Sequence, residues 1–127
     1  MANRAAACER LLLVDDDADT LDTLSDVVVF EGVGEIRRAQ TLSDAEQILA
    51  SGWVPNAVVL DLLLGGDRGE SLLGTLQGDP VLAQVPVIAM SGDHAALVRV
   101  SGSVARTLLK PANPDAVVQA LAEVCNP

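Results

Sequence analysis

The chain has 127 residues, 18 of them acidic and 8 basic, for a formal net charge of −10, and half of its residues are hydrophobic. This length predicts one domain that can bury a core without disulfides or metals. Because clustered cations dominate binding to nucleic acids and to anionic membranes, the acidic balance argues against both partners. The longest apolar runs are far shorter than the ~20 residues of a membrane span. Since no signal-like apolar segment stands near the start, the cytoplasm is the expected location.

The two cysteines, Cys8 and Cys125, stand near opposite ends of the chain. Their spacing is not that of a metal site. Because cytoplasmic proteins keep their thiols reduced, we expect two free thiols.

Strands and helices alternate along the chain. Residues 10–14 are a short apolar run that predicts a strand, and Leu21, Leu24 and Val28 then recur at helical spacing. Further strands are expected at 35–39, 57–60, 85–90 and 104–109, and further helices after Thr41, around 72–76, at 94–100 and after Asn113. The runs 57–60 and 85–90 are apolar throughout, which is typical of strands buried on both faces. No linker or repeat divides the sequence, so one domain is expected over 1–127, with its core at about 10–125.

Five strands alternating with five helices indicate an α/β fold with a parallel sheet covered on both sides. In such sheets ligands bind beyond the carboxyl ends of the strands. Polar residues gather at that edge. They are Asp15, Asp16 and Asp17 after the first strand, Asp61 after the third, Ser91 after the fourth and Lys110 after the fifth.

Taken singly, most of these residues have a structural explanation. Asp17 and Asp19 precede a helix and are typical caps, as Ser91 would be, and Lys110 alone would be a solvated surface residue. Asp61 is different, because it interrupts an apolar run where an unpaired buried carboxylate is costly. The occurrence of all of them at one sheet edge favours a functional site.

The shared edge implies a cation. Two carboxylates ~4 Å apart at an effective dielectric of ~20 repel by about 4 kcal/mol, so three of them need a counter-ion or protons. Oxygen ligands of this kind suit Mg²⁺, which also binds phosphate oxygens. An aspartate can act as a nucleophile and form an acyl phosphate, and Lys110 would then balance the phosphoryl charge.

These motifs together resemble the receiver domain of bacterial response regulators. The matching segments are Leu12–Asp17, Val59–Gly69, Met90–Gly92 and Leu109–Pro111. The resemblance implies a flavodoxin-like (βα)5 sandwich with strand order 2-1-3-4-5. It also implies that Asp61 accepts the phosphoryl group, that Ser91 is the switch hydroxyl and that Lys110 contacts the phosphate. The Mg²⁺ ligands would be Asp15, Asp16, Asp61 and the backbone carbonyl of Leu63.

Four features depart from the family pattern. Thr107 stands where the family usually has an aromatic switch residue, and Gly65 replaces a common proline. The segment from Ser91 to Lys110 is about one helical turn short. Leu63 occupies a position that is commonly polar, so we expect slow self-dephosphorylation unless Asp93 orients the attacking water.

The expected function is that of a stand-alone receiver, a signalling protein rather than an enzyme. It would take phosphate from a histidine kinase or a histidine phosphotransfer protein and bind a downstream protein target, or pass the group on.

The residues suggest three alternatives, of which the second fails on the sequence itself. A small haloacid-dehalogenase-like phosphohydrolase is suggested by Asp17, Asp19 and Thr20, although Leu21 breaks that motif. A calcium-binding EF-hand loop fails because Thr20 stands where glycine is needed. A receiver fold that is never phosphorylated would be a binding module.

Overall fold

Five parallel strands form the central sheet of the computed structural model, which describes residues 3–125. The strands are β1 (Arg10–Val14), β2 (Glu35–Ala39), β3 (Ala57–Asp61), β6 (Val87–Ser91) and β7 (Arg106–Leu109). Their spatial order is β2-β1-β3-β6-β7. Counting these five strands along the chain gives 2-1-3-4-5, so the predicted topology is confirmed.

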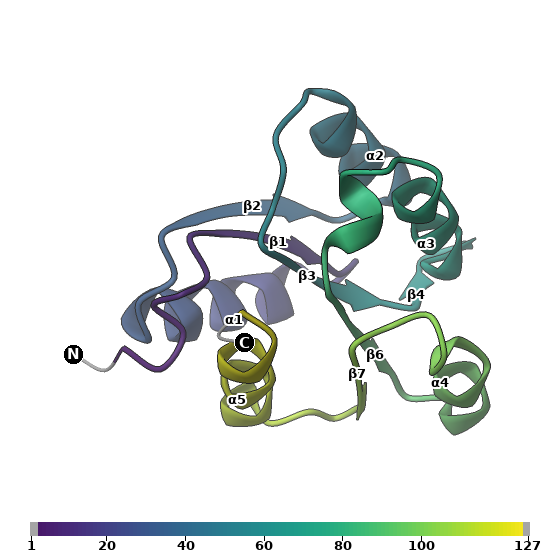
Figure 1. Cartoon of the computed structure of the whole chain (residues 1–127). Helices are drawn as coiled ribbons and strands as arrows, with labels where there is room; N and C mark the ends of the chain where they lie inside the picture. Colours follow the sequence, from purple (N-terminus) through teal and green to yellow (C-terminus); the bar gives the residue numbers. More distant parts are fainter. Residues whose placement is uncertain (1–2, 126–127) are drawn as a thin grey trace.

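Helices cover both faces of the sheet (Figure 1). α1 (Ala18–Phe30) and α5 (Pro114–Cys125) lie on one face, and α2 (Leu42–Ala50), α3 (Glu70–Gln77) and α4 (His94–Val100) lie on the other. A short 3-10 turn, η1 (Leu82–Gln84), precedes β6. Each face buries its own hydrophobic cluster, and every residue of β3 and β6 is buried, as their apolar runs predicted.

Local signals in the sequence set the element boundaries. Thr41 Oγ1 accepts a hydrogen bond from the Asp44 backbone N–H at 3.0 Å, and Asn113 Oδ1 accepts one from the Asp115 N–H at 2.9 Å. Both predicted helix caps are therefore confirmed. The fourth strand begins at Val87, two residues later than expected, because Pro86 has no N–H with which to extend the ladder.

A two-stranded hairpin outside the main sheet was not predicted. It pairs β4 (Leu63–Leu64) with β5 (Asp67–Arg68), and Leu63 is the antiparallel partner of Arg68. Gly65 begins the two-residue turn with φ +61°, a left-handed conformation that glycine adopts readily. Strands of two residues are too short to produce a periodic pattern, which is why the sequence did not reveal them.

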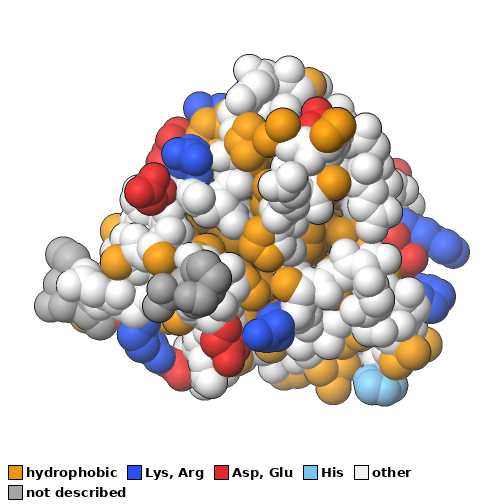
Figure 2. All heavy atoms as spheres, in the orientation of Figure 1, with side chains coloured by type: hydrophobic (Ala, Val, Ile, Leu, Met, Phe, Trp, Pro, Cys, Tyr) orange, Lys and Arg blue, Asp and Glu red, His pale blue; other side chains and the backbone are white. Residues whose placement is uncertain are grey.

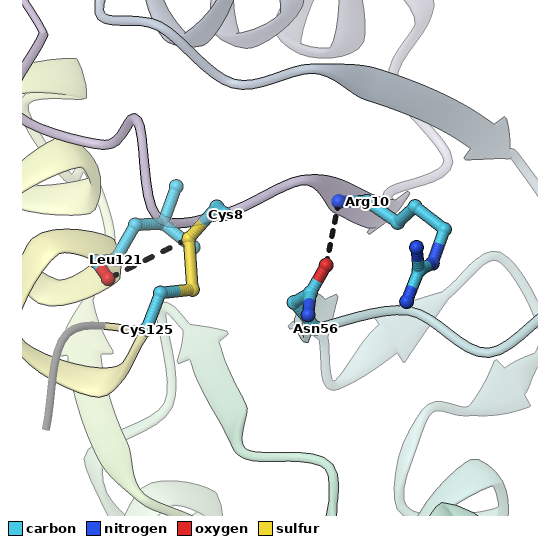
Figure 3. Close-up of a disulfide and its surroundings, with 5 residues drawn as sticks. All are labelled: Cys8, Arg10, Asn56, Leu121 and Cys125. Carbon is cyan, nitrogen blue, oxygen red and sulfur yellow. Dashed lines mark hydrogen bonds between the residues drawn. A yellow bond between two sulfur atoms is a disulfide. The ribbon is translucent and has the colours of Figure 1, made fainter.

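The expectation of two free thiols is wrong, because Cys8 and Cys125 form a disulfide (Figure 3). Their Cα atoms lie 5.4 Å apart although 117 positions separate them in sequence. Residues 3–9 pack where α1 ends, and Ala5 and Cys8 are fully buried in the cluster that also holds α5. Distance along the chain is no guide to distance in the fold, since a sheet with crossovers returns both ends to the same face.

The N-terminal segment is held by backbone hydrogen bonds as well. The Ala5 N–H donates to the Glu31 carbonyl at 2.9 Å, and the Gly34 N–H donates to the Cys8 carbonyl at 3.2 Å. Beyond the disulfide, the Arg10 N–H donates to Asn56 Oδ1 at 2.7 Å, which ties the start of β1 to the loop before β3 (Figure 3). The segment is thus an ordered addition to the sandwich.

Two further features concern possible membrane and anionic partners. Within residues 3–125, no helix is both long and apolar enough to cross a bilayer. On the face drawn in Figure 2, the Lys and Arg side chains lie in separate small groups.

Candidate functional site

Four predicted site residues meet at the carboxyl edge of the sheet. Asp15 follows β1, Asp61 ends β3, Ser91 ends β6 and Lys110 follows β7. The Asp15 residue is only 1% exposed, and Asp61 and Ser91 are each 4% exposed. Their burial in an otherwise apolar sheet requires partners inside the site.

Lys110 supplies one such partner. Its Nζ donates to Asp15 Oδ2 at 3.0 Å and to Asp61 Oδ2 at 2.9 Å. The Lys110 N–H also donates to the Ser91 carbonyl at 2.8 Å, and the peptide bond to Pro111 is cis. The only lysine of the chain therefore spans the two buried carboxylates.

Burial and pairing act in opposite directions on these groups. Burial raises the pKa of Asp15, and the nearby Asp61 charge adds to this effect, while hydrogen bonds from the Asp17 N–H and Lys110 oppose it; the net shift is upward. Burial lowers the pKa of Lys110, but its hydrogen bonds to Asp61 and Asp15 outweigh burial and raise it. Lys110 is thus held as a cation, whereas Asp15 carries its negative charge at a cost.

Asp15, Asp16 and Asp61 form an all-oxygen cluster. Each offers one carboxylate oxygen, and these atoms lie within 4.8 Å of one another. Hard divalent cations such as Mg²⁺ prefer this donor set. Burial is the main cause of the raised pKa of Asp15, and such an ion would relieve the repulsion by Asp61 that adds to it. The residues present therefore fit the predicted metal.

Backbone groups hold two of these carboxylates in place. The Gly65 N–H donates to Asp16 Oδ2 at 3.0 Å, and the Leu63 N–H donates to Asp61 Oδ1 at 3.1 Å. Gly69, at the start of α3, lies so close to β3 that a Cβ there would fall 2.2 Å from the Asp61 carbonyl oxygen. The hairpin and the start of α3 are therefore built tightly around Asp61.

A cavity of about 600 Å³ opens over Asp61. Among its lining residues are Asp16, Asp61, Leu63, Arg68, Glu70, Ser91, Asp93, Arg99 and Lys110. The side chain of Leu63 stands at the rim, and that residue is 64% exposed. Ser91 Oγ accepts a hydrogen bond from the Asp93 N–H at 3.0 Å, and Asp93 caps α4 through the Ala95 N–H. Ser91 and Asp93 therefore both face the space above Asp61.

Three charged residues of this cavity were missed from the sequence. Arg68 belongs to the unpredicted hairpin, and Glu70 and Arg99 belong to α3 and α4. The Arg99 guanidinium lies 3.2 Å from Glu70 Oε1, so an ion pair joins the two helices. Only the position of Arg68, soon after the acidic strand end, could have suggested a place near the site.

Asp17 and Asp19 lie apart from this cluster. Asp17 Oδ1 accepts from the Asp19 N–H at 3.2 Å and Asp17 Oδ2 from Thr20 Oγ1 at 2.7 Å, which caps α1 as expected. These bonds lower the pKa of Asp17, with the Thr20 hydroxyl as the largest cause. The nucleophile that the phosphohydrolase alternative requires is thus occupied as a helix cap.

Comparisons with known proteins agree with this geometry. A model of the response regulator receiver domain family matches residues 11–122, and no curated protein matches the chain. A putative response regulator from Chloroflexus aurantiacus is 27% identical, with TM-score 0.84, covering 94% of this chain and 99% of that chain. The signal receiver domain of a putative Luxo repressor protein from Vibrio parahaemolyticus is 25% identical, with TM-score 0.80 and coverages of 93% and 90%.

A third similar structure carries a modified aspartate. It is a response regulator protein from Burkholderia pseudomallei with a phosphorylated aspartic acid, a calcium ion and citrate. It is 26% identical, with TM-score 0.75, and the match covers 89% of this chain and 66% of that chain. The family match spans most of the sequence and includes all four strand-end residues that meet at the site. The chain therefore belongs to the response regulator receiver domain family of two-component systems.

Proposed function

We propose that this receiver takes a phosphoryl group on Asp61 from a histidine kinase or a histidine phosphotransfer protein. The observation that carries the proposal is the contact of Asp61 Oδ2 with Lys110 Nζ at 2.9 Å beneath an open cavity. A carboxylate that contacts a fixed cation and faces an open cavity is suited to attack the phosphorus atom of a donor. The new oxygen–phosphorus bond forms as the bond from phosphorus to the donor's leaving atom breaks.

Each neighbouring residue has a proposed part in this step. Lys110 stays protonated and balances charge on the phosphoryl oxygens, and the Ser91 hydroxyl donates a hydrogen bond to one of them. Asp15, Asp16, Asp61 and the Leu63 carbonyl would hold Mg²⁺, which, when bound, neutralises phosphoryl charge. The burial of Asp15 and Asp61 supports these roles, because charge interactions strengthen away from water.

The output is proposed to be a change in protein binding. Thr107 lies at the position where many receivers carry an aromatic switch residue, so a rotating ring is not available there to transmit the signal. We propose that residues 1–127 act as one receiver domain, since residues 3–9 pack on the same core as β1. The protein is then a phospho-accepting signalling module that assists its own modification.

Intact mass spectrometry tests the proposal. The protein is incubated with Mg²⁺ and acetyl phosphate, and a gain of one phosphoryl group in wild type but not in Asp61→Asn is expected. Turnover of phosphate esters would support a hydrolase instead, and an unchanged mass would support a binding module. Calorimetry of Asp16→Asn against wild type tests the metal ligands, with weaker Mg²⁺ binding expected.

The fluorescence of Trp53 would be a poor measure of Mg²⁺ binding. Its Nε1 donates to Glu35 Oε1 at 3.1 Å, and its ring packs under Arg37. Glu35 begins β2, whereas the acidic cluster lies at the carboxyl ends of the strands. Because the two sites are at opposite ends of the sheet, calorimetry is the better measurement.

The cytoplasm is the proposed location, where a histidine kinase would deliver the phosphoryl group. The disulfide bears on this proposal because cytosolic disulfides are rare. Thiol trapping in freshly lysed cells decides the point. Alkylated Cys8 and Cys125 would fit a reducing cytosol, and blocked cysteines would point to an oxidising compartment.

A further inference from the structure

Arg68 is held at the mouth of the cavity by the hairpin β4–β5. Its antiparallel partner is Leu63, two positions after Asp61, and cross-strand partners place their side chains on the same face. Both residues line the cavity over Asp61. The turn of this hairpin is tied to the acidic cluster through the hydrogen bond from Gly65 N–H to Asp16.

The charges that line the cavity leave Arg68 without a partner. Lys110 pairs with Asp61, and Arg99 pairs with Glu70. Within residues 3–125 the Arg68 side chain makes no ion pair and no hydrogen bond. It is therefore the one cation of the cavity lining, in this part of the chain, that is free to bind an incoming anion.

A phosphoryl donor needs such a group. It carries about two negative charges at neutral pH and must enter a cavity lined by Asp16, Asp61, Glu70 and Asp93. A guanidinium presents several N–H donors in a planar fork that matches phosphate oxygens, and it remains charged at any relevant pH.

We propose that Arg68 binds the phosphoryl group of the donor and positions it over Asp61 before transfer. This inference rests on the proposed function, because the donor is needed only if Asp61 accepts phosphate. The ligand class is a dianionic phosphoryl donor, such as acetyl phosphate or a phosphohistidine side chain. Of the strand residues of this hairpin, Leu63 and Arg68 line the cavity, and Leu63 is apolar, so the guanidinium is the polar side chain that β4–β5 contributes to the lining.

The first test measures initial rates of Asp61 phosphorylation against acetyl phosphate concentration at fixed Mg²⁺. Arg68→Gln raises the half-saturating concentration about fivefold, as expected for loss of one partly exposed ion pair, and leaves the saturating rate unchanged. Arg68→Lys recovers part of the loss because it keeps the charge without the fork. Arg106→Gln is the matched control, since it removes the same charge from an exposed pair with Glu123 outside this cavity.

The second test needs no turnover. In Asp61→Asn protein, the Arg68 Nε–Hε resonance shifts on titration with acetyl phosphate, and the shift of the Arg106 resonance stays small. Unchanged half-saturation in Arg68→Gln, or no Arg68 shift, overturns the inference while leaving Asp61 as acceptor. If wild type takes no phosphoryl group, the proposed function fails, and the resonance shift alone then decides whether Arg68 binds phosphoryl anions.

Discussion

Lys110 Nζ and Asp61 Oδ2 lie 2.9 Å apart, and the same ammonium group reaches Asp15 Oδ2 at 3.0 Å. One cation thus neutralises part of the charge of two buried carboxylates. No second lysine exists in the chain to replace it.

Lys110→Gln is therefore expected to destabilise the Mg²⁺-free protein by about 2 kcal/mol. Removing one partner of a buried pair costs ~3–5 kcal/mol, and we place the cost lower because the Lys110 side chain is 29% exposed. Urea unfolding measures the change, and Arg106→Gln should stay within ~0.5 kcal/mol of wild type. Added Mg²⁺ should restore part of the loss by binding the folded state. Equal stability of Lys110→Gln and wild type would show that the negative charge of Asp15 and Asp61 is compensated without Lys110.

Leu63→Asn is expected to speed the loss of phosphate from Asp61 by about tenfold. An apolar side chain at the rim cannot orient a water molecule for attack, whereas an amide can do so through a hydrogen bond. Because the amide does not accept the proton, its effect should be smaller than the ~100-fold or more that a general base contributes. The decay of phosphorylated protein is followed by intact mass. Leu109→Asn is the control, because Leu109 is also more than half exposed but lies outside the cavity lining. Identical decay in wild type and Leu63→Asn would assign water orientation to Asp93.

Gly69→Ala is expected to lower the free energy of unfolding by ~1–3 kcal/mol, the usual cost of overpacking. The added Cβ would lie 2.2 Å from the Asp61 carbonyl oxygen and 2.9 Å from Leu62 Cα, so backbone must move. Gly66→Ala is the control, because it adds the same methyl group at a position where nothing lies within 4 Å of the new Cβ. Thermal unfolding compares the two variants. A Gly69→Ala protein as stable as Gly66→Ala would mean that α3 shifts without cost.

Replacing both cysteines by alanine is expected to cost about 2–5 kcal/mol of stability, because the disulfide closes a long loop in the unfolded chain. Urea unfolding with and without dithiothreitol measures this change. The reductant should destabilise wild type and leave the double variant unaffected. A wild type that resists urea equally well in both conditions would contradict the expectation.

A pH effect is expected at the N-terminal segment. Hydrogen bonding from Arg4, whose guanidinium lies 2.8 Å from Glu31 Oε2, holds the pKa of Glu31 below its ordinary value of 4.5. A depressed folded-state pKa contributes stability above the unfolded value and loses it as pH falls through the folded value. Arg4→Gln should therefore raise the pKa of Glu31 toward its ordinary value. The pH range over which protonation of Glu31 lowers the stability of the protein then becomes narrower. NMR titration of the Glu31 carboxyl group measures the shift, and an unchanged titration would exclude the Arg4 contact in solution.

The strand-end residues could be predicted because parallel topology alone brings Asp15, Asp61 and Lys110 together. Sequence periodicity revealed β3 and β6 through their continuous apolar runs. The hairpin that carries Arg68 could not be found this way, since two-residue strands leave no pattern. The Cys8–Cys125 pair was misjudged because its two positions gave no information about the crossovers that bring them together.

The disulfide also decides how the domain responds to mechanical load. A force applied to the two ends passes from Cys8 to Cys125 through a covalent bond, so residues 9–124 between them carry no tension. The sheet, the acidic cluster and Lys110 all lie inside this shielded loop. In an optical trap the oxidised chain should lack an extension of roughly 400 Å, at ~3.3–3.6 Å per residue, that the reduced chain shows when it is pulled open.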